Sequence, residues 1–128
     1  MRCLLDTHAL LWWLFDDPKL STRAREVIAE PDNEILVSAA SAWEISTKYR
    51  IGKLPEAGDI VRQLPSYLQK ARFVELGVSV AHALFAGSLP GPHRDPFDRL
   101  LIAQGKLLDI PIVTIDSVFS DYEVTVLW

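Results

Sequence analysis

The chain has 128 residues, 49% of them hydrophobic, and a formal net charge of −4 at pH 7, so we expect one domain, 1–128, with a substantial core. The acidic balance argues against a protein that holds nucleic acid by general electrostatics, unless a metal ion neutralises several acids at one site. No apolar run is long enough to span a membrane, no signal peptide is recognisable, and the only cysteine, Cys3, excludes an internal disulfide. We therefore expect a cytoplasmic protein without a membrane partner.

Apolar runs and turn residues in the first half of the chain predict strands that alternate with helices. The predicted elements are a strand at Arg2–Leu5, a helix at Ala9–Phe15, a helix capped by Ser21 and reaching about Glu30, a strand at Glu34–Ser38 and a helix at Ala39–Tyr49. Pro18 and Pro31 follow the first two helices, and proline cannot continue a helix.

The same alternation continues in the second half. The predicted elements are a helix at Pro55–Ala71 with a break at Pro65, a strand at Phe73–Leu76, a helix from the cap Ser79 to Phe85, a loop at Gly87–Asp95, a helix at Pro96–Leu108, a strand at Pro111–Ile115 and a candidate fifth strand at Val124–Leu127. This order predicts an α/β fold with a mostly parallel sheet of four to five strands. Right-handed crossovers then bring the carboxyl ends of the strands to one edge, where ligands bind in such folds.

Four acids are expected at that edge. Asp6 and Asp116 each directly follow a predicted strand, Glu44 lies in the first turns of a helix that follows a strand, and Asp98 lies in the first turn of another helix. Carboxylates at close quarters repel one another, and desolvation increases the cost. A hard divalent cation with oxygen ligands, Mg²⁺ or Mn²⁺, would relieve this repulsion.

Each acid also has a purely structural explanation. Asp6 can cap the first helix by accepting from the amide of His8 or Ala9, and Asp116 can cap a turn at Ser117–Phe119. Glu44 can be a solvated helix residue. In the stretch "HRDPFDRLLIAQ", Asp95 can be an N-cap, and Asp98 can favour the helix dipole.

Other kinds of site find less support. The histidines His8, His82 and His93 are scattered, so we expect them to be structural or solvated, and no Cys/His spacing typical of zinc is present. The sequence contains no Walker loop and no GxGxxG motif, which makes a phosphodiester a better substrate than a nucleoside triphosphate. Carboxylate-bound Mg²⁺ commonly serves phosphate chemistry.

Four motifs together give the whole chain a resemblance to a known family. They are "LLDTHALLWW", "SAASAWEISTKYRIGKL", "HRDPFDRLLIAQ" and "IVTIDSVFSDYEVTVLW". In this order the sequence resembles PIN-domain ribonucleases, specifically VapC-type toxins of type II toxin–antitoxin systems. The resemblance implies a PIN-like three-layer α/β/α fold. Gly105 stands where the family would have alanine, which we expect to change packing and no ligand.

The resemblance also implies the site and its chemistry. It makes Asp6, Glu44, Asp98 and Asp116 the catalytic metal ligands, with Asp6 and Asp98 as the central pair, and Asp95 a cap or outer acid. The implied reaction is endonucleolytic hydrolysis of RNA by a water activated by Mg²⁺, with Mn²⁺ as a substitute, leaving a 5′-phosphate and a 3′-hydroxyl. The hydroxyls that stand beside the acids and would orient a carboxylate or a water are those of Thr7 and Thr114.

Partners follow from the same resemblance: an RNA substrate, a homodimer and a cognate antitoxin that covers the site. Trp12 or Phe15 could line a groove for a partner helix, while Leu11 and Leu14 are expected in the core. The candidates for positioning RNA phosphates are Lys48, Arg50, Lys53, Arg94 and Arg99. The alternative for these residues is a solvated basic face.

Three rival functions remain to be weighed. A phospho-receiver domain needs an acceptor aspartate after its middle strand and a lysine after its last, and the chain has neither at the predicted places. A phosphatase with an aspartate nucleophile would want a second acid two residues after Asp6, where His8 stands. A pure binding module, with the acids as helix caps, would bind no Mn²⁺.

Overall fold

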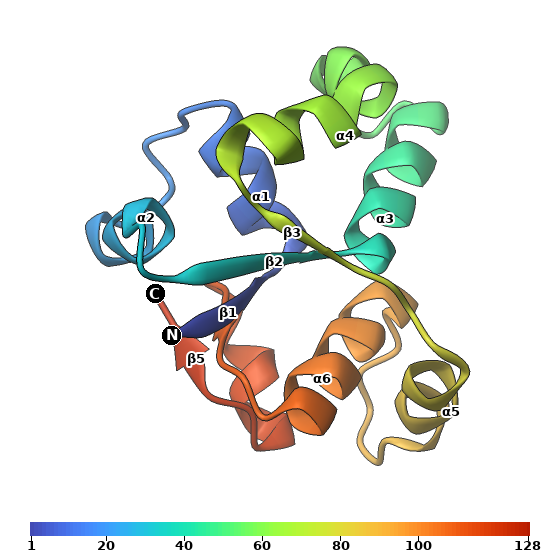
Figure 1. Cartoon of the computed structure of the whole chain (residues 1–128). Helices are drawn as coiled ribbons and strands as arrows, with labels where there is room; N and C mark the ends of the chain where they lie inside the picture. The colour runs from blue at the N-terminus through green and yellow to red at the C-terminus, as the bar shows by residue number, and fades with distance from the viewer.

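Five parallel strands form the centre of the protein in a computed structural model that describes residues 1–128 (Figure 1). Their order in the sheet is β3-β2-β1-β4-β5. The strands are β1 (Arg2–Leu5), β2 (Glu34–Ser38), β3 (Val74–Leu76), β4 (Ile112–Val113) and β5 (Val126–Leu127). Leu5 at the end of β1 is in register with Val37 of β2 on one side and Val113 of β4 on the other. All carboxyl ends therefore lie at one edge of the sheet, as predicted.

Helices cover both faces of the sheet and give three layers (Figure 1). The elements on one face are α1 (Thr7–Leu14), α2 (Thr22–Ala29), the 3-10 helix η1 (Pro55–Ala57) and α4 (Gly58–Ala71). Those on the other are α5 (Val80–Ser88), α6 (Pro96–Leu108) and the 3-10 helix η2 (Ser117–Tyr122). Helix α3 (Ala39–Arg50) contacts α1, α4 and α6 and so joins the two layers. The α/β/α architecture expected from the sequence is confirmed.

Alternation along the central strands divides the core into two clusters. Leu5 and Val37 pack with the helices of the first layer, whereas Leu4 and Leu36 pack with those of the second. Side chains of neighbouring strand residues point to opposite faces, so a strand buried on both sides must be apolar throughout. The short run "CLL" of β1 meets this requirement, and all three residues are fully buried.

Most predicted boundaries agree with the structure, and the differences have local causes. Helix α1 begins at Thr7 rather than Ala9, because Asp6 caps it directly. The break predicted at Pro65 is present as non-helical backbone at Gln63, because the proline ring disrupts the preceding turn. Strands β4 and β5 are shorter than predicted, although the Thr114 amide still donates to the Leu127 carbonyl at 3.1 Å.

Gly105 lets α6 approach the sheet closely. A Cβ atom at this position would lie 2.8 Å from Cδ1 of Ile112 on β4. The alanine expected from the family resemblance would therefore require Ile112 to move. The departure at Gly105 is a packing change, as predicted, and it lies away from every candidate ligand.

Candidate active site

Asp6 lies where the order of the sheet changes direction. Strands β2 and β3 lie on one side of β1, and β4 and β5 lie on the other. The end of β1 therefore adjoins the crevice at the point where the strand order reverses, the topological switch point. The Asp6 side chain is 4% exposed. One carboxylate oxygen accepts from the Ala9 amide at 2.7 Å and the other from the Thr114 hydroxyl at 2.5 Å. The predicted cap and the predicted orienting role of Thr114 therefore coexist.

Glu44 enters the same edge from α3. It is 3% exposed, so the alternative of a solvated helix residue is wrong. The Thr7 hydroxyl donates to Oε1 of Glu44 at 2.6 Å and lies 3.0 Å from the Ser41 hydroxyl. Lys48, one turn further along α3, forms an ion pair with Oε2. Both oxygens of this buried carboxylate are thus held.

Asp95 and Asp98 form the start of α6. Oδ1 of Asp95 accepts from the amides of Phe97 at 2.9 Å and Asp98 at 3.1 Å, so Asp95 is the N-cap predicted from the sequence. Oδ2 of Asp98 lies 2.9 Å from Nε2 of His93. Since the cap fixes the first turn of α6, it also fixes the direction in which the Asp98 side chain leaves the helix.

Asp116 caps η2 through its own carboxylate, which accepts from the Val118 amide at 3.0 Å. The Asp116 amide donates to the Thr114 hydroxyl oxygen at 3.0 Å, and that hydroxyl donates to Asp6. A single buried threonine therefore joins the ends of β1 and β4. The carboxylate of Asp116 is used as a helix cap in this structure.

Burial makes the Asp6 carboxylate hard to ionise. Desolvation raises its pKa to about 6, and the hydrogen bonds from Thr114 and Ala9 oppose this only in part. The nearby His8 also lowers the pKa, whereas the charge of Asp98 raises it. Asp6 forms no ion pair, so its charge has no cationic partner in contact with it. This is the electrostatic state of a group suited to a bound cation.

The charges of the other acids show which of them lie together. Burial raises the pKa of Asp98; its hydrogen bond with His93 opposes the shift, and the charges of Asp95 and Glu44 add to it. Burial alone would lower the pKa of Lys48, but the hydrogen bond and charge of Glu44 reverse the effect, and the charges of Asp95 and Asp98 add to the rise. Asp6, Glu44, Asp95 and Asp98 therefore form one electrostatic group.

The structure holds no set of three or more Asp, Glu, His or Cys side chains arranged to grip a metal ion. The charge of Asp98 acts on Asp6 and that of Glu44 acts on Asp98, whereas Asp116 is not among the main causes of the raised pKa values of Asp6 and Asp98, so a pocket shared by all four acids stays a prediction. Two of the carboxylates have protein partners: Lys48 pairs with Glu44, and His93 contacts Asp98. The donor chemistry, a set of hard carboxylate oxygens, still fits Mg²⁺ or Mn²⁺.

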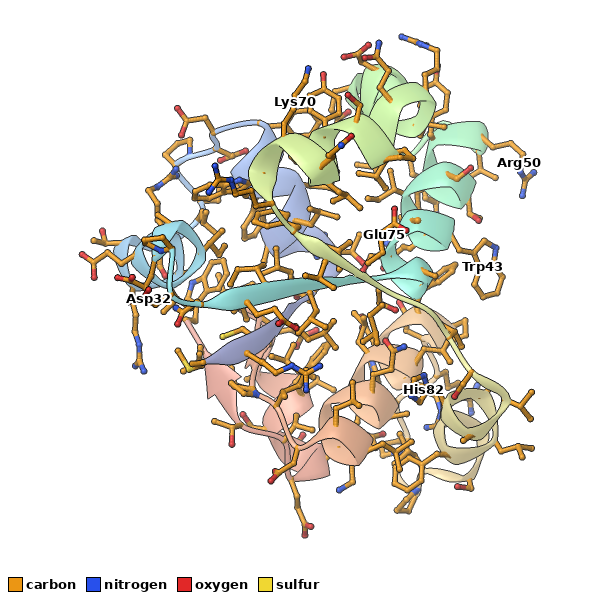
Figure 2. All side chains as sticks on the ribbon, viewed as in Figure 1. Asp32, Trp43, Arg50, Lys70, Glu75 and His82 are labelled. Atoms are coloured by element: carbon orange, nitrogen blue, oxygen red, sulfur yellow. The ribbon has the colours of Figure 1, made fainter.

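Of the basic residues predicted to position RNA, Arg99 has a different role. Its three guanidinium nitrogens donate to the carbonyls of Ala86, Leu89 and His93 at 3.0, 2.5 and 2.9 Å. The guanidinium therefore fastens the loop before α6 to the end of α5, and none of its nitrogens is left free of the protein. The residues Arg50, Lys53 and Arg94 are exposed, and Arg50 points outward from α3 in Figure 2.

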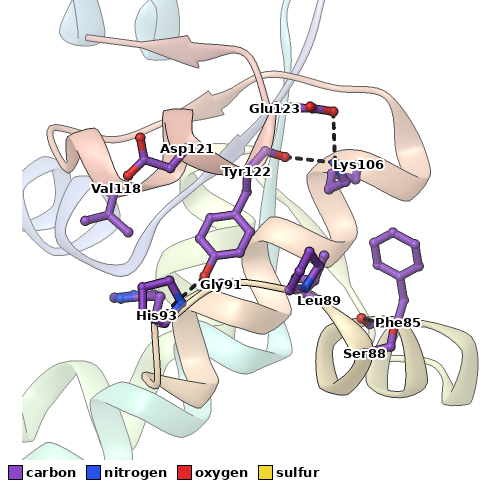
Figure 3. A pocket seen from close by; sticks show the side chains of 12 residues that line it. Phe85, Ser88, Leu89, Gly91, His93, Lys106, Val118, Asp121, Tyr122 and Glu123 are labelled. Atoms are coloured by element: carbon purple, nitrogen blue, oxygen red, sulfur yellow. Dashed lines mark hydrogen bonds and ion pairs between the residues drawn. The ribbon is translucent and has the colours of Figure 1, made fainter.

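His93 has a structural role, one of the two expected for it, and its partner is Asp98. The hydroxyl of Tyr122 accepts from the His93 amide at 3.3 Å and holds this part of the loop against η2 (Figure 3). The available signal was the position of His93 in the motif, five residues before Asp98.

Two further features lie beside the acids. A cavity of about 680 Å³ opens between the loop and η2; His93 lines it, but no acid of the electrostatic group does (Figure 3). On α3, Trp43 is 56% exposed and packs edge-on against Phe97, with ring centres 4.7 Å apart. Figure 2 shows Trp43 projecting outward from α3. No sequence motif indicates either feature.

Comparison with known proteins identifies the family. A model of the PIN domain matches residues 3–124. This chain belongs to the PIN-domain family. Ribonuclease VapC22 of Mycobacterium tuberculosis is 32% identical over 102 residues, which are 78% of this chain and 75% of that protein. Ribonuclease VapC16 of the same organism is 38% identical over 69 residues, so the matched part spans about half of each protein. The chain is thus a PIN domain of the VapC family.

Solved structures agree with the PIN fold. VapBC2 from Rickettsia felis, bound to a DNA fragment from its promoter, has a chain that superposes with a TM-score of 0.73 at 18% identity and covers 99% of this chain and 98% of that one. FitAcB from Neisseria gonorrhoeae gives 0.66 at 19% identity, with 98% and 96% covered. At such identities the likeness shows the fold alone. None of the helices of this PIN domain combines the length and the apolar character needed to cross a membrane.

Proposed function

We propose that this VapC-family PIN domain is a metal-dependent endoribonuclease toxin that hydrolyses RNA phosphodiester bonds and is inhibited by a cognate antitoxin. The observation that carries the proposal is the buried Asp6 carboxylate, which lies at the switch point of the sheet without a contacting cation and beside the charge of Asp98. The ribonuclease names of its two VapC relatives support the choice of RNA. We also propose that the protein acts in the cytoplasm.

Asp6 and Asp98 would hold Mg²⁺, or Mn²⁺ in its place, with Glu44 and Asp116 as further ligands. Such an ion supplies charge neutralisation at the phosphate and lowers the pKa of a bound water. The chain itself orients the ligands: Thr114 fixes Asp6, Thr7 fixes Glu44, and Asp95 fixes the turn that carries Asp98. No side chain of the protein serves as the nucleophile.

The test uses purified, antitoxin-free protein and end-labelled structured RNA, with Mg²⁺ or with EDTA. We expect cleavage with Mg²⁺, none with EDTA, and products that end in a 5′-phosphate and a 3′-hydroxyl. Asp98→Asn keeps the shape of the side chain but loses its charge and should lower cleavage by at least ~100-fold, beyond the usual effect of residues that only orient a ligand. Asp32→Asn, at an exposed turn far from the acids, is the matched control.

Cleavage that resists EDTA would reject the metal-dependent mechanism. Full activity of Asp98→Asn would reject the ligand assignment. If calorimetry detects no Mn²⁺ binding and the protein cleaves no RNA, the acids are helix caps and the protein is a binding module.

The partners we propose are the antitoxin and a second copy of the chain. Phe15 is exposed on the surface beside α1, while Trp12 is half-buried against Trp128, which makes Phe15 the better candidate for contact with an antitoxin helix. On α5, Val80 is 78% and Leu84 71% exposed, an apolar surface that supports a homodimer. Light scattering of Leu84→Asp tests this: a mass halved relative to the unchanged protein is expected, and an unchanged dimer excludes α5.

A further inference from the structure

We propose that a small cavity between α1 and the end of α3 binds a backbone phosphate of the RNA next to the one that is cleaved. The inference rests on the proposed ribonuclease function and adds to it a second contact with the substrate. The cavity has a volume of about 270 Å³. Its lining residues are Thr7, His8, Leu11, Glu44, Lys48, Lys53 and Leu54.

The cavity adjoins the acids. Thr7 and Glu44, which line it, also belong to the candidate active site, where the Thr7 hydroxyl donates to Glu44. The lining also includes the cation Lys53 and the apolar side chains of Leu11 and Leu54. An RNA strand whose phosphate lies at Asp6 could therefore continue directly into this cavity, with a ribose against the leucines.

The turn after α3 places Lys53 in the cavity. Gly52 has a φ of 81°, in the left-handed region that favours glycine, and the chain reverses there. The amides of Lys53 and Leu54 then both donate to the Lys48 carbonyl, at 2.8 and 3.3 Å. This closure of the helix end brings Lys53 and Lys48 to one cavity although they lie on different segments.

Lys53 is the available cation of the pair. Lys48 is committed to Glu44, whereas Lys53 is exposed and forms no ion pair. His8, which is exposed, also lines this cavity, and its ring centre lies 5.5 Å from that of Trp12. In a protein of net charge −4, these groups form a local site where a phosphate is attracted beside acids that would repel it.

The larger cavities suit a phosphate less well. Asp121 and Glu123 line the cavity of about 680 Å³, and its one lysine, Lys106, already donates to the Tyr122 carbonyl at 2.8 Å. The cavity of about 390 Å³ between α3 and α4 is mostly apolar, and its only charged residue is Glu75. The charge of the lining therefore distinguishes the small cavity from both.

The test starts from a cleavage site that the unchanged protein makes in a defined RNA. Short oligoribonucleotides around that site carry one neutral methylphosphonate linkage at each flanking position in turn. Lys53→Gln is compared with Lys70→Gln, which makes the same change at an exposed position on α4 that lies outside the cavity. Thermal melts confirm that both variants fold, and Lys53→Arg tests for rescue.

We expect Lys53→Gln to raise KM about tenfold with little change in kcat, because a flanking phosphate is bound equally in the ground and transition states. The salt dependence of log kcat/KM should become shallower by about 0.7 for the loss of one phosphate contact on a single strand. One methylphosphonate position should weaken the unchanged protein to a similar extent and have no further effect on Lys53→Gln. Lys70→Gln should behave as the unchanged protein.

Each result decides something. Equal losses in Lys53→Gln and Lys70→Gln would mean that overall charge, and not this cavity, governs RNA binding, and would overturn the phosphate site. The subsite would be overturned if Lys53→Gln cleaved RNA as well as the unchanged protein does. It would also be overturned if the effect of the mutation added to the effect of the methylphosphonate at every position. In both cases the ribonuclease function would stand. An unchanged protein that cleaves no RNA would overturn both proposals.

Discussion

The two central acids of the site are supported in different ways. Asp6 directly follows the buried strand β1, and its carboxylate oxygens accept hydrogen bonds from the Ala9 amide of α1 and from the fully buried Thr114. Asp98 is partly exposed and depends on His93, which belongs to a loop held by Arg99 and Tyr122. One acid is thus positioned by the core of the sheet and the other by a set of surface hydrogen bonds. The half of the site that carries Asp98 should therefore be easier to disturb without unfolding the protein.

The largest effect should come from Asp6→Asn, which removes the acid on the rigid side. Cleavage should fall by at least ~100-fold, as for a lost ligand. In EDTA at pH 7, however, the variant should be more stable. The pKa of Asp6 is raised from 3.8 to about 6 in the folded protein, so its contribution to stability is present below pH 3.8 and is lost as pH rises through 6.

Burying the Asp6 charge at pH 7 costs on the order of 3 kcal/mol. The mutation removes this cost, but it also weakens the hydrogen bond with Thr114, so the net gain in stability is smaller. Urea unfolding of metal-free protein at pH 4 and pH 7 measures the effect. A stabilisation of the same size at both values would show that the charge of Asp6 is not its origin.

Arg99→Lys should loosen the loop that carries His93 and so supports Asp98. A lysine cannot reach three carbonyls, so the loop should loosen, with a loss of about 2–4 kcal/mol in the free energy of unfolding and a drop in cleavage. Hydrogen exchange of the loop amides and urea unfolding report it, with Arg94→Lys as the control on the same segment. If Arg99→Lys were as stable and as active as the parent, Arg99 would instead be a charge that positions RNA.

His93→Ala should separate position from folding. We expect Mn²⁺ affinity, measured by calorimetry, to fall about 10-fold, as for residues that orient a ligand, with a smaller change in stability. His93→Gln keeps a hydrogen-bond donor and should recover part of the affinity. Equal affinity in His93→Ala and the unchanged protein would assign the contact to the metal-free state alone.

Gly105→Ala should have the smallest effect, at the joint where α6 meets β4. Alanine favours the helix by about 1 kcal/mol, but its Cβ would crowd Ile112, so the two effects nearly cancel. The additional change Ile112→Val relieves the contact, and the pair should be more stable than the sum of the single changes. If the changes in the free energy of unfolding of the two single variants simply add, the contact between residue 105 and Ile112 is not tight.

The sequence predicted what depends on periodicity and on short motifs. The buried runs gave the strands, Pro65 gave the break, and Ser21, Ser79 and Asp95 gave their caps. The edge that collects Asp6, Glu44 and Asp98 followed from parallel topology alone. The role of each acid as a metal ligand stays a prediction.

The sequence could not predict the partners of these groups, because partners are set by three-dimensional distance. Arg99 is indistinguishable in sequence from a surface cation until the loop folds over it. His93 and Tyr122 are 29 residues apart, and nothing local indicates that they meet. Asp116 shows the converse limit: topology placed it at the correct edge, but its own helix determines where its carboxylate turns.

Thr114 makes the chemistry at this edge observable. Its hydroxyl is fully buried and donates to Oδ2 of Asp6, with 2.5 Å between the two oxygens. The hydroxyl proton should therefore exchange slowly with solvent and resonate far downfield in an NMR spectrum. The same oxygen accepts from the Asp116 amide, whose signal should shift in step. Protonation of one buried carboxyl group could thus be followed from two neighbouring resonances, without any label placed in the site.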